Sequence, residues 1–228
     1  MRTGTATVVS LGGSVLFPDG IDAEVLRKWV ALLKARASRR APFVVVVGGG
    51  KLARSYQAAA GKVRRVPAAE RDWLGIAATR ANAALVRTAL GNLADPEFVD
   101  SPEKGRRLRK PVTVVSGWKP GSSTDYVAAQ LAARFGARVL VNAGKPAFVY
   151  DKDPARYKSA KPFARLTWRE YGSVVPHAWK PGASAPIDPV AARFLARRGI
   201  AAVMLQGRDT ANVARFLDGK PYRGTLIG

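Results

Sequence analysis

The 228-residue sequence has no cysteine and a single histidine. Without cysteine it forms neither disulfides nor cysteine-ligated metal sites, which fits a cytoplasmic protein. Its apolar runs, such as "FVVVV" at 43–47, are too short to cross a membrane. The opening "MRTGTATVVSLGGSVLF" lacks a signal peptide's order of basic, apolar and small residues. We therefore expect a cytoplasmic protein that is not inserted in a membrane.

Acidic residues are also scarce: 16 Asp and Glu stand against 38 Lys and Arg, a formal net charge of +22. Such an excess favours polyanionic ligands, from nucleotides to nucleic acid. The basic residues are scattered, and no aromatic-interleaved RNA-binding motif accompanies them. A solvated basic surface explains most of them, so nucleic-acid binding is expected to be secondary.

Apolar β-branched segments alternate with helical patterns along the whole chain. Buried strands are predicted at 6–11, 43–47, 112–116, 138–143 and 201–206, with a short last strand at 224–227. Helices are predicted after Asp22 and Asp188 and over about 51–60, 68–90, 125–136, 167–175 and 209–219. Strands that are apolar throughout are typical of a parallel sheet covered on both faces. The predicted fold class is therefore α/β, a three-layer αβα sandwich with a mainly parallel central sheet.

We expect one domain over residues 1–228, since no repeat or low-complexity segment divides the chain. The one seam lies in the polar, proline-containing stretch 92–111. It separates an N-terminal half of about 1–110 from a C-terminal half of about 111–228.

Three of the predicted strands end in glycine-rich turns: Gly12-Gly13-Ser14, Gly48-Gly49-Gly50 and "SGWKPGSSTD" at 116–125. Parallel sheets bind ligands at the carboxyl ends of their strands, and glycine lets backbone N–H groups approach an anion closely. None of the three turns matches GxxxxGK[ST] or GxGxxG. The sequence thus predicts a phosphate-binding edge of another type.

Charged residues next to these turns are candidates for the chemistry. Lys51 and Arg54 fall on the first turn of a helix, where they could meet phosphate or simply form a solvated face. Asp125 begins another helix, either as its N-cap or as a group that orients lysines or Mg²⁺. Asp72 precedes an apolar helix and could be only a helix-start acid.

Six segments, in this order, carry a family resemblance over nearly the whole chain: "GGSVLFPDGID", "VVVGGGKLARSY", "DWLGIAATRANA", "GWKPGSSTDYVAAQLA", "VYDKDP" and "APIDPVAARFLARRGI". They resemble the amino acid kinase superfamily and, within it, the archaeal-type uridylate (UMP) kinases. The resemblance implies transfer of a phosphoryl group from ATP to UMP, with Mg²⁺ accompanying ATP and no metal site of the protein's own. It also implies a homohexamer.

The resemblance places UMP on the N-terminal half together with the 116–125 loop, and ATP on the C-terminal half. The residues that it implies for catalysis are Lys51, Arg54 and Asp125. Those that it implies for ATP are Gly12, Gly13, Ser14, Gly50, Arg54, Gly144, Lys145, Tyr150 and Asp153. Those that it implies for UMP are Gly49, Asp72, Trp118, Lys119, Pro120, Gly121, Ser122, Ser123 and Thr124.

The chain departs from the superfamily pattern at two places. Ser10 stands where many members carry a lysine, so Lys51, Arg54, Lys119 and Lys145 are all candidates for the cation that neutralises phosphate. Residues 145–147 read Lys-Pro-Ala where related sequences show an N-[IV]-D core. The acceptor phosphate is already an anionic nucleophile, so no general base is needed and His177 is expected to be structural.

Two other functions remain open. An isopentenyl phosphate kinase would carry a histidine near the acceptor phosphate, but "GGGKLAR" has none, and N-acetylglutamate, glutamate 5- and carbamate kinases fit the acceptor loop less well. A nucleotide- or nucleic-acid-binding relative without turnover is the alternative of a different class. The +22 charge and the altered 145–147 segment favour it, and the intact glycine loops oppose it.

Overall fold

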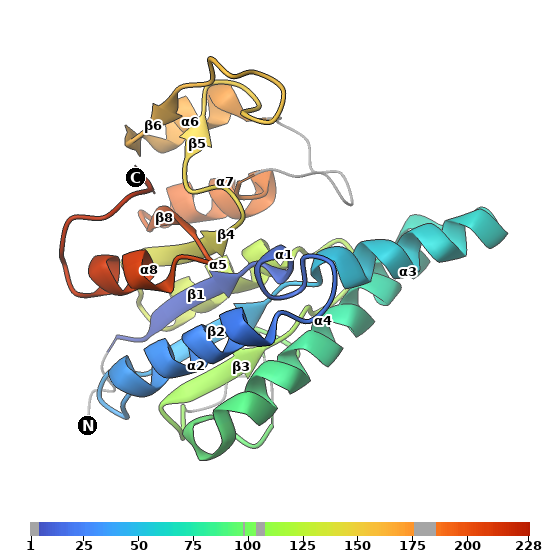
Figure 1. The fold of residues 1–228 in the computed structure, drawn as a ribbon, viewed down its shortest axis with the longest axis horizontal. Coiled ribbons are helices and arrows are strands. Elements are labelled where there is room, and N and C mark those ends of the chain that lie inside the picture. Colours follow the sequence, from blue (N-terminus) through green and yellow to red (C-terminus); the bar gives the residue numbers. More distant parts are fainter. Residues whose placement is uncertain (1–4, 98, 104–107, 176–185) are drawn as a thin grey trace.

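The computed structural model describes residues 5–97, 99–103, 108–175 and 186–228. Its centre is a seven-stranded sheet in the order β3-β2-β1-β4-β8-β9-β7 (Figure 1). The strands are β1 (Thr7–Leu11), β2 (Phe43–Val47), β3 (Val112–Val115), β4 (Val139–Gly144), β7 (Arg165–Leu166), β8 (Ala201–Gln206) and β9 (Thr225–Ile227). All neighbouring pairs are parallel except β8 and β9. The predicted, mainly parallel sheet is confirmed.

Helices cover both faces of this sheet. On one side lie α2 (Ala23–Arg36), α4 (Ala68–Leu90) and α8 (Thr210–Leu217), and on the other lie α5 (Thr124–Arg134), α6 (Trp168–Val174) and α7 (Pro189–Arg197). Successive strand residues point to opposite faces, so Val45 and Val47 join the first core and Val44 and Val46 the second. This arrangement explains why the strands are apolar throughout, and it confirms the three-layer αβα prediction.

The predicted helix boundaries rest on local capping chemistry. Asp22 accepts the N–H of Val25 at 3.0 Å at the start of α2. Asp188 accepts the N–H groups of Val190 and Ala191 at the start of α7, with a proline at the first helical position. Gly91 ends α4 with a φ of +55°. These three boundaries agree with the sequence.

The smaller elements were not predicted. They are α1 (Gly13–Leu16), η1 (Gly91–Leu93) and the hairpin of β5 (Val149–Tyr150) and β6 (Pro162–Phe163), which forms a sheet of its own. Part of the predicted connection 92–110 runs beside the edge strand β3, where Val99 donates its N–H to the Val114 oxygen at 2.9 Å. This pairing covers a sheet edge that would otherwise be open.

Helix α3 (Gly50–Val63) extends with the start of α4 beyond the sheet (Figure 1). None of its residues is buried, and Tyr56 and Val63 are 55% and 86% exposed. α3 therefore presents apolar side chains to its surroundings. No helix in the described ranges has the length and apolar character needed to cross a membrane.

Candidate active site

The loops after β1, β2, β3 and β4 lie at one edge of the sheet because these strands are parallel. The turns are also joined directly: Gly12 donates its N–H to the Ala143 oxygen at 3.0 Å, and Gly48 to the Leu11 oxygen at 2.9 Å. The structure thus brings together the first two predicted glycine turns and the end of β4, where Gly144 lies.

The first two glycine turns interlock. A Cβ on Gly13 would overlap the Gly50 nitrogen and lie 2.5 Å from the Gly48 oxygen. Gly50 has a φ of +62°, and a Cβ there would overlap the Gly13 carbonyl group. Ser14 follows Gly13 in the single turn of α1. These glycines are thus required for packing between the two loops, whatever they contribute to anion binding.

The third loop contains a tight turn held by α4. Ser122 donates its N–H to the Lys119 oxygen at 3.1 Å, and Gly121 has a φ of +76°. Pro120 and Gly121 occupy the positions that a type II turn favours for these residues. The Asp72 carboxylate of α4 accepts the Gly121 N–H at 2.8 Å. Asp72 and the predicted UMP loop are therefore in direct contact.

Trp118 and Lys119 lie on the outer side of this loop. The Lys119 ammonium is 3.8 Å from the centroid of the Trp118 ring, a cation–π contact. Both residues line a hollow that Trp73 of α4 also lines. The loop therefore offers an aromatic and cationic surface next to the Asp72–Gly121 contact.

The hydroxyl groups of the loop differ in their partners. The Ser123 Oγ accepts the Tyr126 N–H at 3.0 Å and donates to the Asp188 carboxylate. The Ser122 Oγ is buried and has no hydrogen-bond partner among the described residues. Thr124 is the first residue of α5. The Ser123 hydroxyl therefore donates its hydrogen bond within the protein, whereas the Ser122 hydroxyl has no acceptor among the described residues.

Asp125 does not cap α5, so that interpretation was wrong: Ser123 is the N-cap. The Asp125 carboxylate instead accepts the Ser10 hydroxyl at 2.8 Å, the Asn142 amide at 3.3 Å and the Asp188 N–H at 3.4 Å. No salt bridge joins it to a lysine or arginine in the described part of the chain, so the expected contact with cations is not found. Burial and, next, the Asp188 carboxylate raise the pKa of Asp125 to about 6.

One of the four candidate cations, Lys51, is paired with an acid, and a second, Lys145, acts on the same acid through its charge. Lys51 forms an ion pair with Asp19, and the hydrogen bond and charge of Lys51 lower the pKa of that carboxyl. The positive charge of Lys145 makes a smaller contribution to the same lowering of the Asp19 pKa. Lys51 lies in the first turn of α3, Lys145 follows β4, and Arg54 is exposed one turn into α3.

The remaining predicted ATP residues belong to the β5–β6 hairpin. Tyr150 lies edge-on to Phe148, with ring centroids 6.3 Å apart. Asp153 follows the strand in an exposed turn, where it accepts the Ala155 N–H at 2.9 Å. The Val149 N–H donates to the Thr225 hydroxyl at 2.9 Å, which attaches the hairpin to β9. Among the described residues, Tyr150 and Asp153 bond to or pack against the hairpin and the adjacent Phe148.

Among the residues that the structure describes, no three Asp, Glu or His side chains form a group that could hold a metal ion. Mg²⁺ does not need such a group, because it keeps several waters and binds mainly substrate phosphates with one or two carboxylates. His177 lies outside the described residues.

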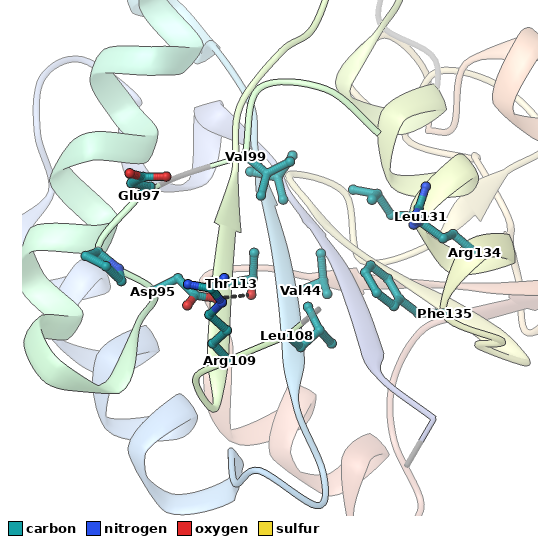
Figure 2. Close-up of a pocket in the computed structure, with 12 residues that line it drawn as sticks. Val44, Asp95, Glu97, Val99, Leu108, Arg109, Thr113, Leu131, Arg134 and Phe135 are labelled. Atoms are coloured by element: carbon teal, nitrogen blue, oxygen red, sulfur yellow. Dashed lines mark hydrogen bonds between the residues drawn. The ribbon is translucent and has the colours of Figure 1, made fainter. Parts of the chain in front are cut away.

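A separate cavity of about 240 Å³ lies beside β3 and the end of α5 (Figure 2). Figure 2 shows the Thr113 hydroxyl bonded to Asp95 at 2.8 Å, with Val44, Leu131 and Phe135 on the apolar side. None of the predicted site residues lines this cavity. It is therefore distinct from the glycine-loop edge.

Sequence reasoning missed several residues that organise the edge: Thr79, Asn82, Asn142 and Asp188. Thr79 and Asn82 fall within the buried stripe of α4 with Ile76, Ala83 and Val86. Polar residues in an apolar helical stripe need hydrogen-bond partners, and that signal was visible in the sequence. Asp188 was noted only as a helix cap, although its second oxygen also accepts the Ser123 hydroxyl.

This edge, with its interlocked glycine turns on a three-layer αβα fold, agrees with comparison to known families. Residues 5–206 match the model of the amino acid kinase family, and the chain belongs to that family.

Similar proteins are named uridylate kinases. The chain is 38% identical to the uridylate kinase of Haloquadratum walsbyi, over 96% of this chain and 92% of that protein. It is 36% identical to that of Pyrococcus abyssi, over 96% and 98%. The crystal structure of uridylate kinase from Archaeoglobus fulgidus superposes with a TM-score of 0.84 at 32% identity, covering 97% of this chain and 99% of that one. The resemblance predicted from sequence is confirmed.

Proposed function

We propose that this protein is a UMP kinase that transfers the γ-phosphoryl group of ATP to UMP and releases UDP and ADP. The observation that carries the proposal is the third glycine loop, which α4 holds through Asp72 at the edge where the other two glycine turns interlock. The similarity to uridylate kinases extends over nearly the whole chain, which supports a role for both of its halves in the proposed reaction.

We propose that UMP occupies the surface formed by Gly49, Asp72 and the 118–124 loop. The buried Ser122 hydroxyl, which has no hydrogen-bond partner among the described residues, supports this assignment, because such a donor is suited to a ligand oxygen. Trp118 and Lys119 offer an aromatic face and a positive charge beside the same loop. The ribose contact that the resemblance gives to Asp72 would share this carboxylate with the Gly121 N–H.

We propose that ATP lies across Gly12, Gly13, Ser14 and Gly50, with Tyr150 and Asp153 toward its nucleoside. Lys51 pairs with Asp19 and the charge of Lys145 acts on the same carboxylate, and we assign both lysines to neutralising phosphate. Arg54 is exposed one turn into α3. The reaction needs alignment and charge neutralisation rather than a general base.

Mg²⁺ belongs to the donor substrate in this proposal. When bound to ATP it neutralises phosphate charge, which the chain's lysines and backbone N–H groups also do at the glycine turns. The oxygens of Asp125 already accept three hydrogen bonds. We therefore assign no resident metal site to this carboxylate.

We propose that the chain assembles as a homohexamer, as the family resemblance of the sequence implies. The support in this chain is α3, which buries no residue and exposes Tyr56 and Val63. The cytoplasmic location and the secondary role of nucleic acid stay predictions from the sequence.

The proposed activity is tested by measuring ADP release with ATP, Mg²⁺ and one acceptor at a time. The acceptors are UMP, CMP, AMP, isopentenyl phosphate and N-acetylglutamate. We expect kcat/KM for UMP to exceed the others by at least about a hundredfold, because an acceptor site with buried polar groups rejects ligands that leave them unpaired. A folded preparation that does not turn over UMP would contradict the proposal, and binding to RNA that weakens steeply with salt would favour the alternative.

A further inference from the structure

The helix α4 contacts two glycine loops at once through one threonine. The Gly117 N–H donates to the Thr79 Oγ1 at 2.8 Å, and the same hydroxyl donates to the Ile76 oxygen at 2.7 Å. The Thr79 methyl group faces the other loop: a Cβ on Gly49 would lie 3.4 Å from it. Thr79 is 6% exposed and therefore lies buried between the two loops.

One turn further along α4, Asn82 holds the second loop by its backbone. Its Nδ2 donates to the Gly48 oxygen at 2.8 Å and to the Gly49 oxygen at 3.2 Å. Asn82 is 2% exposed, and its bond to the Gly48 oxygen is buried, while the bond to the Gly49 oxygen is partly buried. Asp72, at the start of the same helix, holds the Gly121 N–H of the third loop. One rigid element thus carries attachments to both loops.

The geometry points to a positioning role: we propose that Thr79 and Asn82 fix the spacing between the Gly48–Gly50 turn and the 116–123 loop. This inference rests on the proposed function, in which the Gly48–Gly50 turn contributes Gly50 to the ATP phosphates and Gly49 to the UMP surface, and the 116–123 loop binds UMP. Neither side chain needs to touch a substrate. Phosphoryl transfer depends on in-line alignment, and a displacement of about 1 Å can lower the rate about a hundredfold.

The two residues have separable effects because they hold different loops. In the described part of the chain, Thr79 is the α4 side chain that bonds the third loop at Gly117, so its loss loosens the acceptor side at that point. The side-chain bonds of Asn82 among the described residues go to Gly48 and Gly49, so its loss loosens the turn after β2. A substitution that only destabilised the protein would reduce the active fraction and leave the KM values for ATP and UMP unchanged.

The test is steady-state kinetics over a grid of ATP and UMP concentrations, with folded content checked by circular dichroism. We expect Thr79→Val to raise KM for UMP at least about fivefold, leave KM for ATP within about twofold and lower kcat about 10- to 100-fold. Thr79→Ser keeps the hydroxyl and should recover kcat to within about threefold of wild type. Asn82→Ala should lower kcat about 10- to 100-fold with a smaller change in KM for UMP.

The matched control is Thr88→Val, the same change at an exposed position of the same helix. We expect wild-type kinetics from it. If Thr79→Val fails to fold, Thr79→Ala carries the same prediction, since it removes the hydroxyl and leaves room for water at the Gly117 N–H.

Two failures are distinguishable. A wild-type protein that does not phosphorylate UMP contradicts the proposed function. An active wild type combined with a folded Thr79→Val or Thr79→Ala variant whose KM for UMP is unchanged contradicts the positioning role alone. Failure of Thr79→Ser to recover activity contradicts it as well, because the hydroxyl is the group that binds Gly117.

Discussion

Replacing Gly50 with alanine is expected to lower the free energy of unfolding by about 2–5 kcal/mol. A left-handed backbone costs a residue with a Cβ about 1–2 kcal/mol, and overpacking costs about 1–3 kcal/mol more. Gly50 incurs both, since its φ is +62° and a Cβ there would overlap the Gly13 carbonyl group. For a chain of 228 residues the midpoint of thermal unfolding should fall by about 5–15 °C.

Gly199 supplies the matched control because it has the same φ of +62°. A Cβ on Gly199 would meet nothing within 4 Å, so Gly199→Ala tests the backbone cost without the overlap. We expect a loss of about 1–2 kcal/mol there. Thermal or urea unfolding of the two variants measures the difference, and equal losses would show that the loops do not interlock as the structure has them.

Gly50→Ala should also reduce turnover by about a hundredfold or more in whatever fraction folds. Opening the contact between Gly13 and Gly50 moves the turn after β1 away from the turn after β2. Both turns lie at the edge assigned to the phosphates, where small displacements are costly. Gly199, at the end of α7, is followed by β8 and should leave kcat unchanged.

The large elements were predictable because local chemistry specifies them. Mainly apolar strands without a polar–apolar alternation indicated burial on both faces, and Asp22, Asp188 and Gly91 marked helix ends by capping rules that act over a few residues. The strands β5, β6 and β7 escaped prediction because each has two residues, too few for a pattern. They form because distant segments supply their partners.

The site was predictable as an edge but not as a network. Glycine turns after parallel strands located it, since such strands end on one side. The bonds that organise it join residues far apart in sequence: Asn82 to Gly48 spans 34 positions, and Ser10 to Asp125 spans 115. The N-cap of α5 was assigned wrongly for the same reason, since Ser123 and Asp125 are both residue types that favour a helix start. Only the fold shows that Ser10 and Asn142 donate hydrogen bonds to the Asp125 carboxylate.

Asp125→Asn is expected to stabilise the protein at neutral pH and to reduce its activity. Burial, followed by the Asp188 carboxylate, raises the pKa of Asp125 to about 6, above its ordinary value of 3.8. A pKa raised by about two units corresponds to about 3 kcal/mol of stability lost once the group is ionised. Asparagine keeps an oxygen for Ser10 and Asn142, loses the acceptor of the long 3.4 Å bond from the Asp188 N–H, and removes the charge.

The sign of the pH dependence follows from proton binding. Between about pH 4 and pH 6 the folded protein holds the Asp125 proton more tightly than the unfolded chain, so wild-type stability falls as pH rises through that window. The midpoint of unfolding of Asp125→Asn minus that of wild type should therefore be small near pH 4, grow up to pH 6 and stay constant above it. Asp218→Asn is a control of opposite sign, because Arg36 lowers the pKa of Asp218.

The activity of Asp125→Asn tests whether turnover uses the negative charge of Asp125. A buried carboxylate that lacks a cationic partner in the described chain costs stability, and groups of this kind are typical of functional sites. Asp125 accepts bonds from Ser10 at the end of β1, Asn142 on β4 and the Asp188 N–H at the start of α7, so it joins three elements that meet at the glycine-loop edge. We expect kcat of Asp125→Asn at pH 7.5 to fall at least about tenfold, with its thermal midpoint raised by about 5–10 °C. A variant that is both more stable and fully active would show that turnover does not use the charge, and the catalytic assignment of Asp125 would then be wrong.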